Sequence, residues 1–142
     1  MTVAAASSPA PRQAAAEPAA YQPGVCNIGP EEIARRRRAG HIGAVITVIA
    51  LVALVALHAP PLVRLVLAIP AAGAASGYLQ AWLRFCAGFG AKGVFNFGQL
   101  GQVSPVADDG ERALDRVRAT QIGLASLLIG VAVGTVAALL PV

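Results

Sequence analysis

The segment that decides the fold is RRRRAGHIGAVITVIALVALVALHAPP, residues Arg35–Pro61, in which four arginines precede an uninterrupted apolar run and two prolines end it. Two further apolar runs follow, at about 62–83 and 121–140. A helix of about 17 to 25 apolar residues can cross the hydrocarbon core of a bilayer. We therefore predict an all-α membrane protein with three transmembrane helices, at about 42–58, 62–83 and 121–140.

The amino-acid composition favours the same fold class. The chain has 142 residues, of which 56% are hydrophobic and 13% are charged, whereas about a quarter of the residues of a soluble domain are charged. Three spans in lipid account for the missing charge, because charged side chains are costly at the centre of a bilayer. We predict one membrane domain over residues 25–142 and no separate soluble domain.

The basic residues are distributed asymmetrically around the spans. Of the eleven arginines and lysines, all but Arg64 lie before the first span or between the second and the third. Loops rich in basic residues stay on the cytoplasmic side of a membrane. This pattern predicts a cytoplasmic N-terminus, a cytoplasmic loop at about 84–118 and a C-terminus outside. Arg64 is expected to extend toward the outer headgroups.

Prolines and acidic residues mark the helix boundaries. Pro60 and Pro61 end the first span, and Pro61 can also start the second, so the two spans should form a helical hairpin. Pro70 is expected to kink the second span. Asp108, with Glu111 three residues later, predicts the start of a helix that runs on into the third span.

The residues before the first span divide into two parts. Residues 1–24 are rich in Ala and Pro and are predicted to form a disordered cytoplasmic tail. Pro30 and the two glutamates after it suit the start of a short cytoplasmic helix. Gly40 would allow a bend between this short helix and the first span.

Small residues recur on the second and third spans. Gly73 and Gly77 form a GxxxG pattern, and Ser126, Gly130 and Gly134 follow each other at intervals of four residues. Small residues let two helix backbones come close, and this packing drives helix association in lipid. We predict that these five residues are the helix-packing positions and that the two sets face each other.

Cys26 and Cys86 are the only cysteines, and both are predicted at the cytoplasmic face, where thiols stay reduced. Neither belongs to a CxxC motif, and no His/Cys cluster has zinc spacing. The simplest interpretation is two free thiols. They could instead form a redox pair, share a metal or, next to the membrane, carry a palmitoyl group. Thiol chemistry would also need a base, and only His41 is predicted on that side.

The run Arg35–Arg38 is above all a topology signal. It could also bind anionic lipid or an acidic partner, since a basic residue near an anionic leaflet contributes about 1 kcal/mol. All four phenylalanines of the chain lie in the glycine-rich loop after the second span, so this loop is expected at the interface. Nucleic-acid binding is not expected, because the basic residues flank apolar spans and no aromatic stacking platform accompanies them.

Three observations argue against a cofactor or transport function. GFGAKG, residues 88–93, matches GxGxxG. The dinucleotide motif needs a strand before it and a helix after it, whereas this segment follows a predicted transmembrane helix. His41 and His58 lie at opposite ends of the first span, about 25 Å apart, so they cannot share a metal or a haem. Residues 42–57 of the first span and the whole third span contain no ionisable residue, whereas ion pathways normally need some. No cofactor is predicted.

Two segments have the density of a family signature: CNIGPEEIARRRRAGHIG, residues 26–43, and RFCAGFGAKGVFNFG, residues 84–98. With them, the chain resembles a family of small, uncharacterised multi-pass membrane proteins of bacteria. The resemblance covers most of the chain except the first twenty or so residues. It implies a location in the inner membrane of a bacterium, but no activity and no catalytic residue.

These observations favour a non-enzymatic accessory or scaffold subunit that acts by helix packing. Its expected partners are the bilayer, including anionic lipid, and either further copies of itself or the other subunits of a membrane complex. Two alternatives remain open. One is a thiol-redox or metal-binding protein that uses Cys26 and Cys86, and the other is a protein that docks on anionic lipid or a partner through Arg35–Arg38 and the Phe-rich loop.

Overall fold

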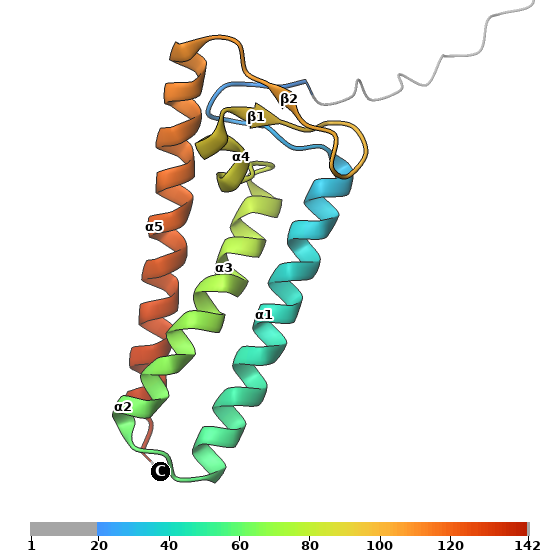
Figure 1. The fold of residues 1–142 in the computed structure, drawn as a ribbon. Helices are drawn as coiled ribbons and strands as arrows, with labels where there is room; N and C mark the ends of the chain where they lie inside the picture. Colours follow the sequence, from blue (N-terminus) through green and yellow to red (C-terminus); the bar gives the residue numbers. More distant parts are fainter. Residues whose placement is uncertain (1–19, 142) are drawn as a thin grey trace, which may run out of the picture.

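The computed structural model describes residues 20–141, which form three long helices with a small folded region at one end (Figure 1). All three helices are long and apolar enough to cross a membrane, with mean hydropathies of 2.3, 1.6 and 2.3. The prediction of a mostly helical chain with three candidate membrane spans is therefore confirmed. Residues 1–19, most of the predicted disordered tail, lie outside the described residues.

The first helix, α1 (Pro30–Ala56), is continuous over 27 residues, which is about 40 Å at 1.5 Å per residue. The short helix predicted before the first span is therefore not a separate element, and Gly40 makes no break. Gly40 lies instead against the ring of Tyr78, where an added Cβ would be 3.0 Å from the ring carbon Cδ1. The glycine supplies room for an aromatic ring, a need that the sequence alone did not show.

The second span follows after a short connection, so the predicted hairpin of the first two spans is present. His58, in that connection, has a φ of 51°. The helix tightens into a 3-10 turn just before Pro70, because this proline has no N–H to donate to the carbonyl four residues earlier and its ring crowds that carbonyl. The span consists of three consecutive pieces: α2 (Pro61–Arg64), η1 (Leu65–Leu67) and α3 (Ala68–Trp82).

The third helix, α5 (Asp109–Leu139), has 31 residues and begins well before the apolar run. Asp108 stabilises its start as predicted, since the backbone N–H of Glu111 donates to Asp108 Oδ1 at 2.9 Å. The helix therefore reaches beyond the membrane-spanning part, and it shortens the predicted loop to residues 84–108.

The chain between α3 and α5 folds together with the segment before α1. We call this region the cap and define it as residues 20–29 and 84–108. It contains α4 (Ala87–Lys92) and two antiparallel strands, β1 (Val94–Phe95) and β2 (Ser104–Pro105). The all-α prediction missed these strands because two residues are too few for an alternation of apolar and polar side chains to show. Residues 20–24, counted in the predicted tail, belong to the cap.

The three helices lie in one layer, with α3 between α1 and α5 (Figure 1). Helix α3 packs against both neighbours, whereas α1 and α5 make no substantial contact with each other within the described residues. Helix α1 is the least covered, and its Ile42, Ile49 and Val52 side chains are 62 to 63% exposed. Lipid tails are as apolar as these side chains, so a bilayer is the solvent that this surface fits.

Candidate functional site

The side-chain amide of Asn27 joins the two segments that form the cap. Its Nδ2 donates to the Cys86 carbonyl at 3.1 Å, and its Oδ1 accepts from the Cys86 N–H at 2.6 Å. Backbone bonds reinforce this contact, from the Asn27 N–H to the Arg84 carbonyl and from the Gly29 N–H to the Asn96 carbonyl. Asn27 is fully buried, so its loss would leave the Cys86 N–H without a partner and the Cys86 carbonyl with only the Gly90 N–H as a donor.

The thiol of Cys86 lies against an arginine of the basic run. Arg36 Nη2 donates to Cys86 Sγ at 2.8 Å, and the guanidinium carbon of Arg36 lies 6.0 Å from the centre of the Phe89 ring. Cys86 is only 1% exposed. It therefore has a neighbour that is typical of reactive cysteines and a burial that is typical of structural ones.

A buried carboxylate completes what we call the Glu32–Arg36–Cys86 cluster. Glu32 is 1% exposed, and its oxygens lie 3.8 Å from Arg36 Nη2 and 3.5 Å from Arg35 Nη1. Within residues 20–141, neither Glu32 Oε2 nor Arg36 Nε has a hydrogen-bond partner. Buried charges are usually both paired and hydrogen-bonded, so this cluster is less completely bonded than the Asn27 amide beside it.

The other cysteine lies in the same cap but in different surroundings. Cys26 is 8% exposed, and its Sγ lies 3.9 Å from the carbonyl oxygen of Ile28. Both thiols are free. Among the described residues, no group of three or more His, Cys, Asp or Glu side chains could hold a metal ion. His41, the base considered from the sequence, has its Nδ1 2.7 Å from the Tyr78 hydroxyl.

The four arginines of the run Arg35–Arg38 do not form one surface. Arg36 is turned toward the cap, and the other three are exposed. Phe85 is fully buried, and the other three phenylalanines of the loop are half-buried. Phe85 is therefore part of the interior of the cap, whereas Phe89 lies near the guanidinium group of Arg36.

A second buried acid, Asp115 on α5, holds the start of the cap in place. Its Oδ2 accepts from the Tyr21 hydroxyl at 2.9 Å and its Oδ1 from the Gly24 N–H at 2.7 Å. Burial of the hydroxyl, followed by its bond to Asp115, raises the pKa of Tyr21. The sequence reasoning missed Asp115. The helix dipole favours acids in the first turn of a helix. Asp115 lies two turns into α5, and this position was the signal in the sequence.

Gly77, one of the predicted packing residues, lies where α3 meets α1. An added Cβ would be 2.7 Å from the Cα of Gly40 and 2.8 Å from the Arg36 carbonyl oxygen. Gly43 makes a similar contact further along α1, where a Cβ would lie 2.9 Å from the backbone nitrogen of Ala74. Gly77 therefore faces the first span, whereas the sequence predicted that it faces the third.

The small residues of the third span meet alanines of the second. A Cβ on Gly130 would be 2.6 Å from the Cβ of Ala72, and one on Gly134 would be 3.1 Å from the Cβ of Ala68. Ser126 is also buried, and its hydroxyl donates to a carbonyl of its own helix at 2.7 Å. The pairing predicted between this stripe and the GxxxG pattern is therefore wrong, since α3 turns alanines toward α5.

Gly73, the remaining residue of the GxxxG pattern, is exposed, and an added Cβ would meet no atom within 4 Å. The two glycines of the pattern thus have different positions. Gly77 is used in a contact within the chain, and Gly73 is left on the surface of the layer.

Arg64 joins the three spans at the end opposite the cap. It is 3% exposed, and its Nε and Nη1 donate to the carbonyls of Ala59 and Leu140, both at 2.8 Å. The prediction that Arg64 extends toward the headgroups is therefore wrong. The physical reason is that the last carbonyls of a helix have no partner within the helix, and the guanidinium group binds carbonyls that follow α1 and α5.

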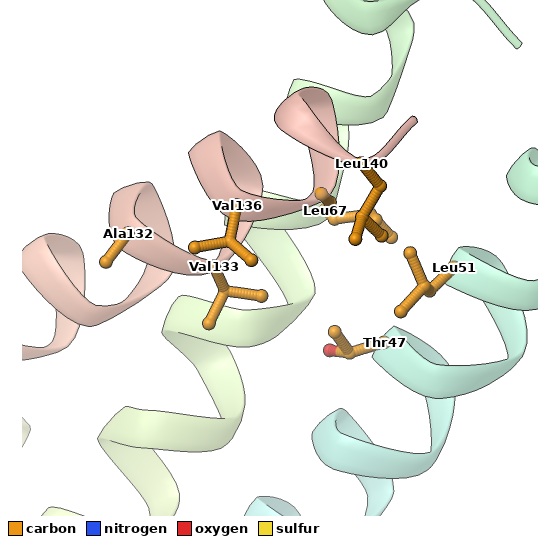
Figure 2. Close-up of a pocket in the computed structure, with 8 residues that line it drawn as sticks. Thr47, Leu51, Leu67, Ala132, Val133, Val136 and Leu140 are labelled. Atoms are coloured by element: carbon orange, nitrogen blue, oxygen red, sulfur yellow. The ribbon is translucent and has the colours of Figure 1, made fainter. Parts of the chain in front are cut away.

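An apolar groove runs between α1 and α5, with α3 as its floor. It consists of two adjoining pockets of about 300 and 270 Å³, which share Thr47 and Val133. In the pocket further from the cap, side chains from α1 and α5 point into the space between the helices (Figure 2). The floor of the pocket nearer the cap is formed by Ala71, Ala74 and Ala75.

No protein family, curated protein or solved structure matches this chain. The geometry offers two candidate sites of different character. One is the Glu32–Arg36–Cys86 cluster, which is polar and buried in contact with the cap. The other is the groove between α1 and α5, which is apolar and open along the membrane-spanning part.

Proposed function

We propose that the chain is a non-enzymatic accessory or scaffold subunit of a membrane complex, which holds a transmembrane helix in the groove between α1 and α5. The observation that carries this proposal is the alanine floor of the groove. Small residues let a further backbone come close, and close packing is what associates helices in lipid, where no hydrophobic driving force acts between them. The helix comes from a second copy of this chain or from another subunit.

The arrangement of the helices supports the same function. The close contacts use one side of α3 for α1 and the other side for α5, and within residues 20–141 α1 and α5 make no substantial contact with each other. A helix in the groove would contact all three. It would also cover Val48, Val133 and Val136, which line the groove and are 59%, 37% and 62% exposed.

Crosslinking from within the groove tests the proposal. A photo-reactive amino acid at Val133 should form a crosslink to a protein in native membranes, whereas the same residue at Leu128 should not. Leu128 is the matched control, because it lies on the same helix, is 69% exposed and does not line the groove. An adduct of twice 14.3 kDa identifies a second copy, and another mass identifies another subunit. The absence of any protein adduct at position 133 contradicts the proposal.

A bulky substitution provides an independent test. Val133→Trp should fill the groove and reduce the size of the assembly purified in mild detergent, as seen on a native gel. Leu128→Trp should leave the assembly unchanged, since it adds the same ring outside the groove. Equal behaviour of the two variants would mean that the groove is not the contact surface.

The location that fits this function is the inner membrane of a bacterium, with the cap in the cytoplasm. Within residues 20–141, every arginine and lysine except Arg64 lies in the cap or in the adjoining turns of α1 and α5. An excess of basic residues is characteristic of the cytoplasmic side. A reporter that works only outside the cytoplasm should be active when it is fused after Val142, and a reporter that works only in the cytosol should be inactive there. The opposite result would mean that the C-terminus lies in the cytoplasm.

A thiol-based function is the second candidate, and the contact between Arg36 and Cys86 favours it. It predicts that a small alkylating reagent modifies Cys86 in membranes faster than Cys26, and that Arg36→Ala slows the reaction. If both thiols react slowly and the variants Cys26→Ala and Cys86→Ala behave as the wild type, this function is excluded.

A further inference from the structure

An open pocket of about 500 Å³ lies on α1 where its arginine run meets its apolar part. The face of α1 that packs on α3 carries Gly40 and Gly43, and helical geometry places the pocket residues on a different face. The pocket therefore opens away from α3. Its lining combines two arginines and one glutamate with small and apolar side chains: Glu31, Ala34, Arg35, Arg38, Ala39, Ile42 and Leu100.

One wall of the pocket is held in place by a hydrogen bond. Leu100 belongs to the chain between β1 and β2, and its backbone N–H donates to Glu31 Oε2 at 3.1 Å. Glu31 is thus already bound within the protein, and Arg35 lies 3.5 Å from Glu32. Arg38 makes no ion pair within the described part of the chain. The pocket therefore holds a cation that is available to an external anion.

The same face of α1 is apolar below the pocket. Ile42, Ile46 and Ile49 follow Arg35 and Arg38 at helical spacing, and these isoleucines are 51 to 63% exposed. The cations lie at the cap end of this stripe, and the exposed aliphatic side chains extend from them into the membrane-spanning part.

We propose that this pocket binds one anionic phospholipid, with its phosphate between Arg35 and Arg38 and an acyl chain along Ile42, Ile46 and Ile49. Charge complementarity favours this ligand, because guanidinium groups bind phosphate through paired hydrogen bonds. A free phosphate ion would contact only the two arginines and not the isoleucines. A zwitterionic lipid would bring no net charge to the arginines. The site lies on a different face of α1 from the groove, so it does not depend on the helix proposed to occupy the groove.

The run of four arginines supplies a matched pair of variants. Arg37 is exposed like Arg38 and carries the same charge, but it does not line the pocket. Native mass spectrometry of the full chain, released from detergent containing phosphatidylglycerol or phosphatidylcholine, measures how many lipids stay bound. We expect one phosphatidylglycerol on the wild type. Since one basic residue near an anionic lipid contributes roughly a factor of five in affinity, Arg38→Ala should weaken binding about fivefold, and Arg37→Ala should leave it unchanged.

Two further measurements separate the site from simple surface charge. Equal losses for Arg37→Ala and Arg38→Ala would overturn the proposal, because only the total charge would then matter. Leu100→Ala removes a wall without changing the charge, and it should also weaken phosphatidylglycerol binding. Inorganic phosphate is the probe for a free anion. If it binds the delipidated protein as tightly as the lipid does, the acyl chain has no role and the lipid assignment is wrong.

Discussion

The cap and the helical layer of this protein are held together by opposite means. The cap depends on a few buried polar side chains, above all Asn27 and Asp115, each of which bonds to groups far away in the sequence. The layer depends on glycines and alanines that bring helix backbones together. A polar contact is lost when one atom changes its character, whereas a small-residue contact is lost when volume is added. The two regions should therefore respond to different kinds of substitution.

Gly130→Leu is expected to have the largest effect, because it adds volume where the layer is tightest. An added Cβ would overlap the Ala68 carbonyl oxygen and the side chain of Ala72, and extra volume in a packed contact costs about 3 kcal/mol or more when backbone must move. Unfolding in mild detergent measures the loss. Gly73→Leu is the control, and it should change the stability by less than about 0.5 kcal/mol, since surface substitutions usually do. Equal effects would mean that the contacts of Gly130 do not hold the layer together.

Arg64 is an exception to this difference between the two regions. It makes polar contacts, although it lies in the helical layer, at the end far from the cap. Arg64→Met keeps much of the length of the side chain but leaves the carbonyls of Ala59 and Leu140 without their donor. Hydrogen bonds from a charged group are worth about 1.5 to 3 kcal/mol each, and part of this is recovered because no charge remains buried. We expect a loss of about 2 to 3 kcal/mol in the same unfolding measurement. An unchanged stability would show that water replaces the guanidinium group.

Asn27→Asp tests the cap with a substitution that changes almost no volume. It replaces the donor to the Cys86 carbonyl with an oxygen, so two acceptors would face each other in a buried place, at a cost of about 2 kcal/mol. In a Cys26→Ala background, a bulky maleimide should then label Cys86 faster, because the cap opens more often. Gln99→Glu makes the same change at an exposed position and should leave the labelling rate as it is. A labelling rate that is also unchanged in Asn27→Asp would mean that this amide does not keep the cap closed.

The spans could be predicted from the sequence because each is encoded by consecutive residues. An apolar run of sufficient length, the two prolines of the hairpin and Asp108 before the third helix are all local signals. The rotation of each helix about its axis is not local. A repeat of small residues shows that a helix can be approached closely, but not by which neighbour, and for this reason Gly77 was assigned to the wrong helix.

The cap could not be predicted because its bonds join residues that are distant in the chain. Asn27 and Cys86 are 59 positions apart, and Tyr21 and Asp115 are 94 positions apart. No periodicity connects such pairs. The sequence did provide one indication, since the two segments that have the density of a family signature, residues 26–43 and 84–98, are the ones that Asn27 joins. The segment before α1 and the phenylalanine-rich loop together form one folded region, the cap.

The smallest expected effect concerns pH and sharpens the description of the cap. The folded protein holds the pKa of Tyr21 above its ordinary value, which is about 10. As the pH rises past about 10, the unfolded chain releases the tyrosine proton before the folded chain does. The stability that Tyr21 contributes is therefore fully present below pH 10 and is lost progressively above it.

Tyr21→Phe isolates this contribution from the other titrating groups. Near neutral pH the variant should be less stable than the wild type by about 1 kcal/mol, the usual value of one hydrogen bond, because Asp115 loses the hydroxyl that donates to it. The difference between the two unfolding midpoints should shrink as the pH rises above 10. If the difference instead stayed constant to high pH, the Tyr21 hydroxyl would not be buried against Asp115. The start of the cap would then be held mainly by the bond from the Gly24 N–H.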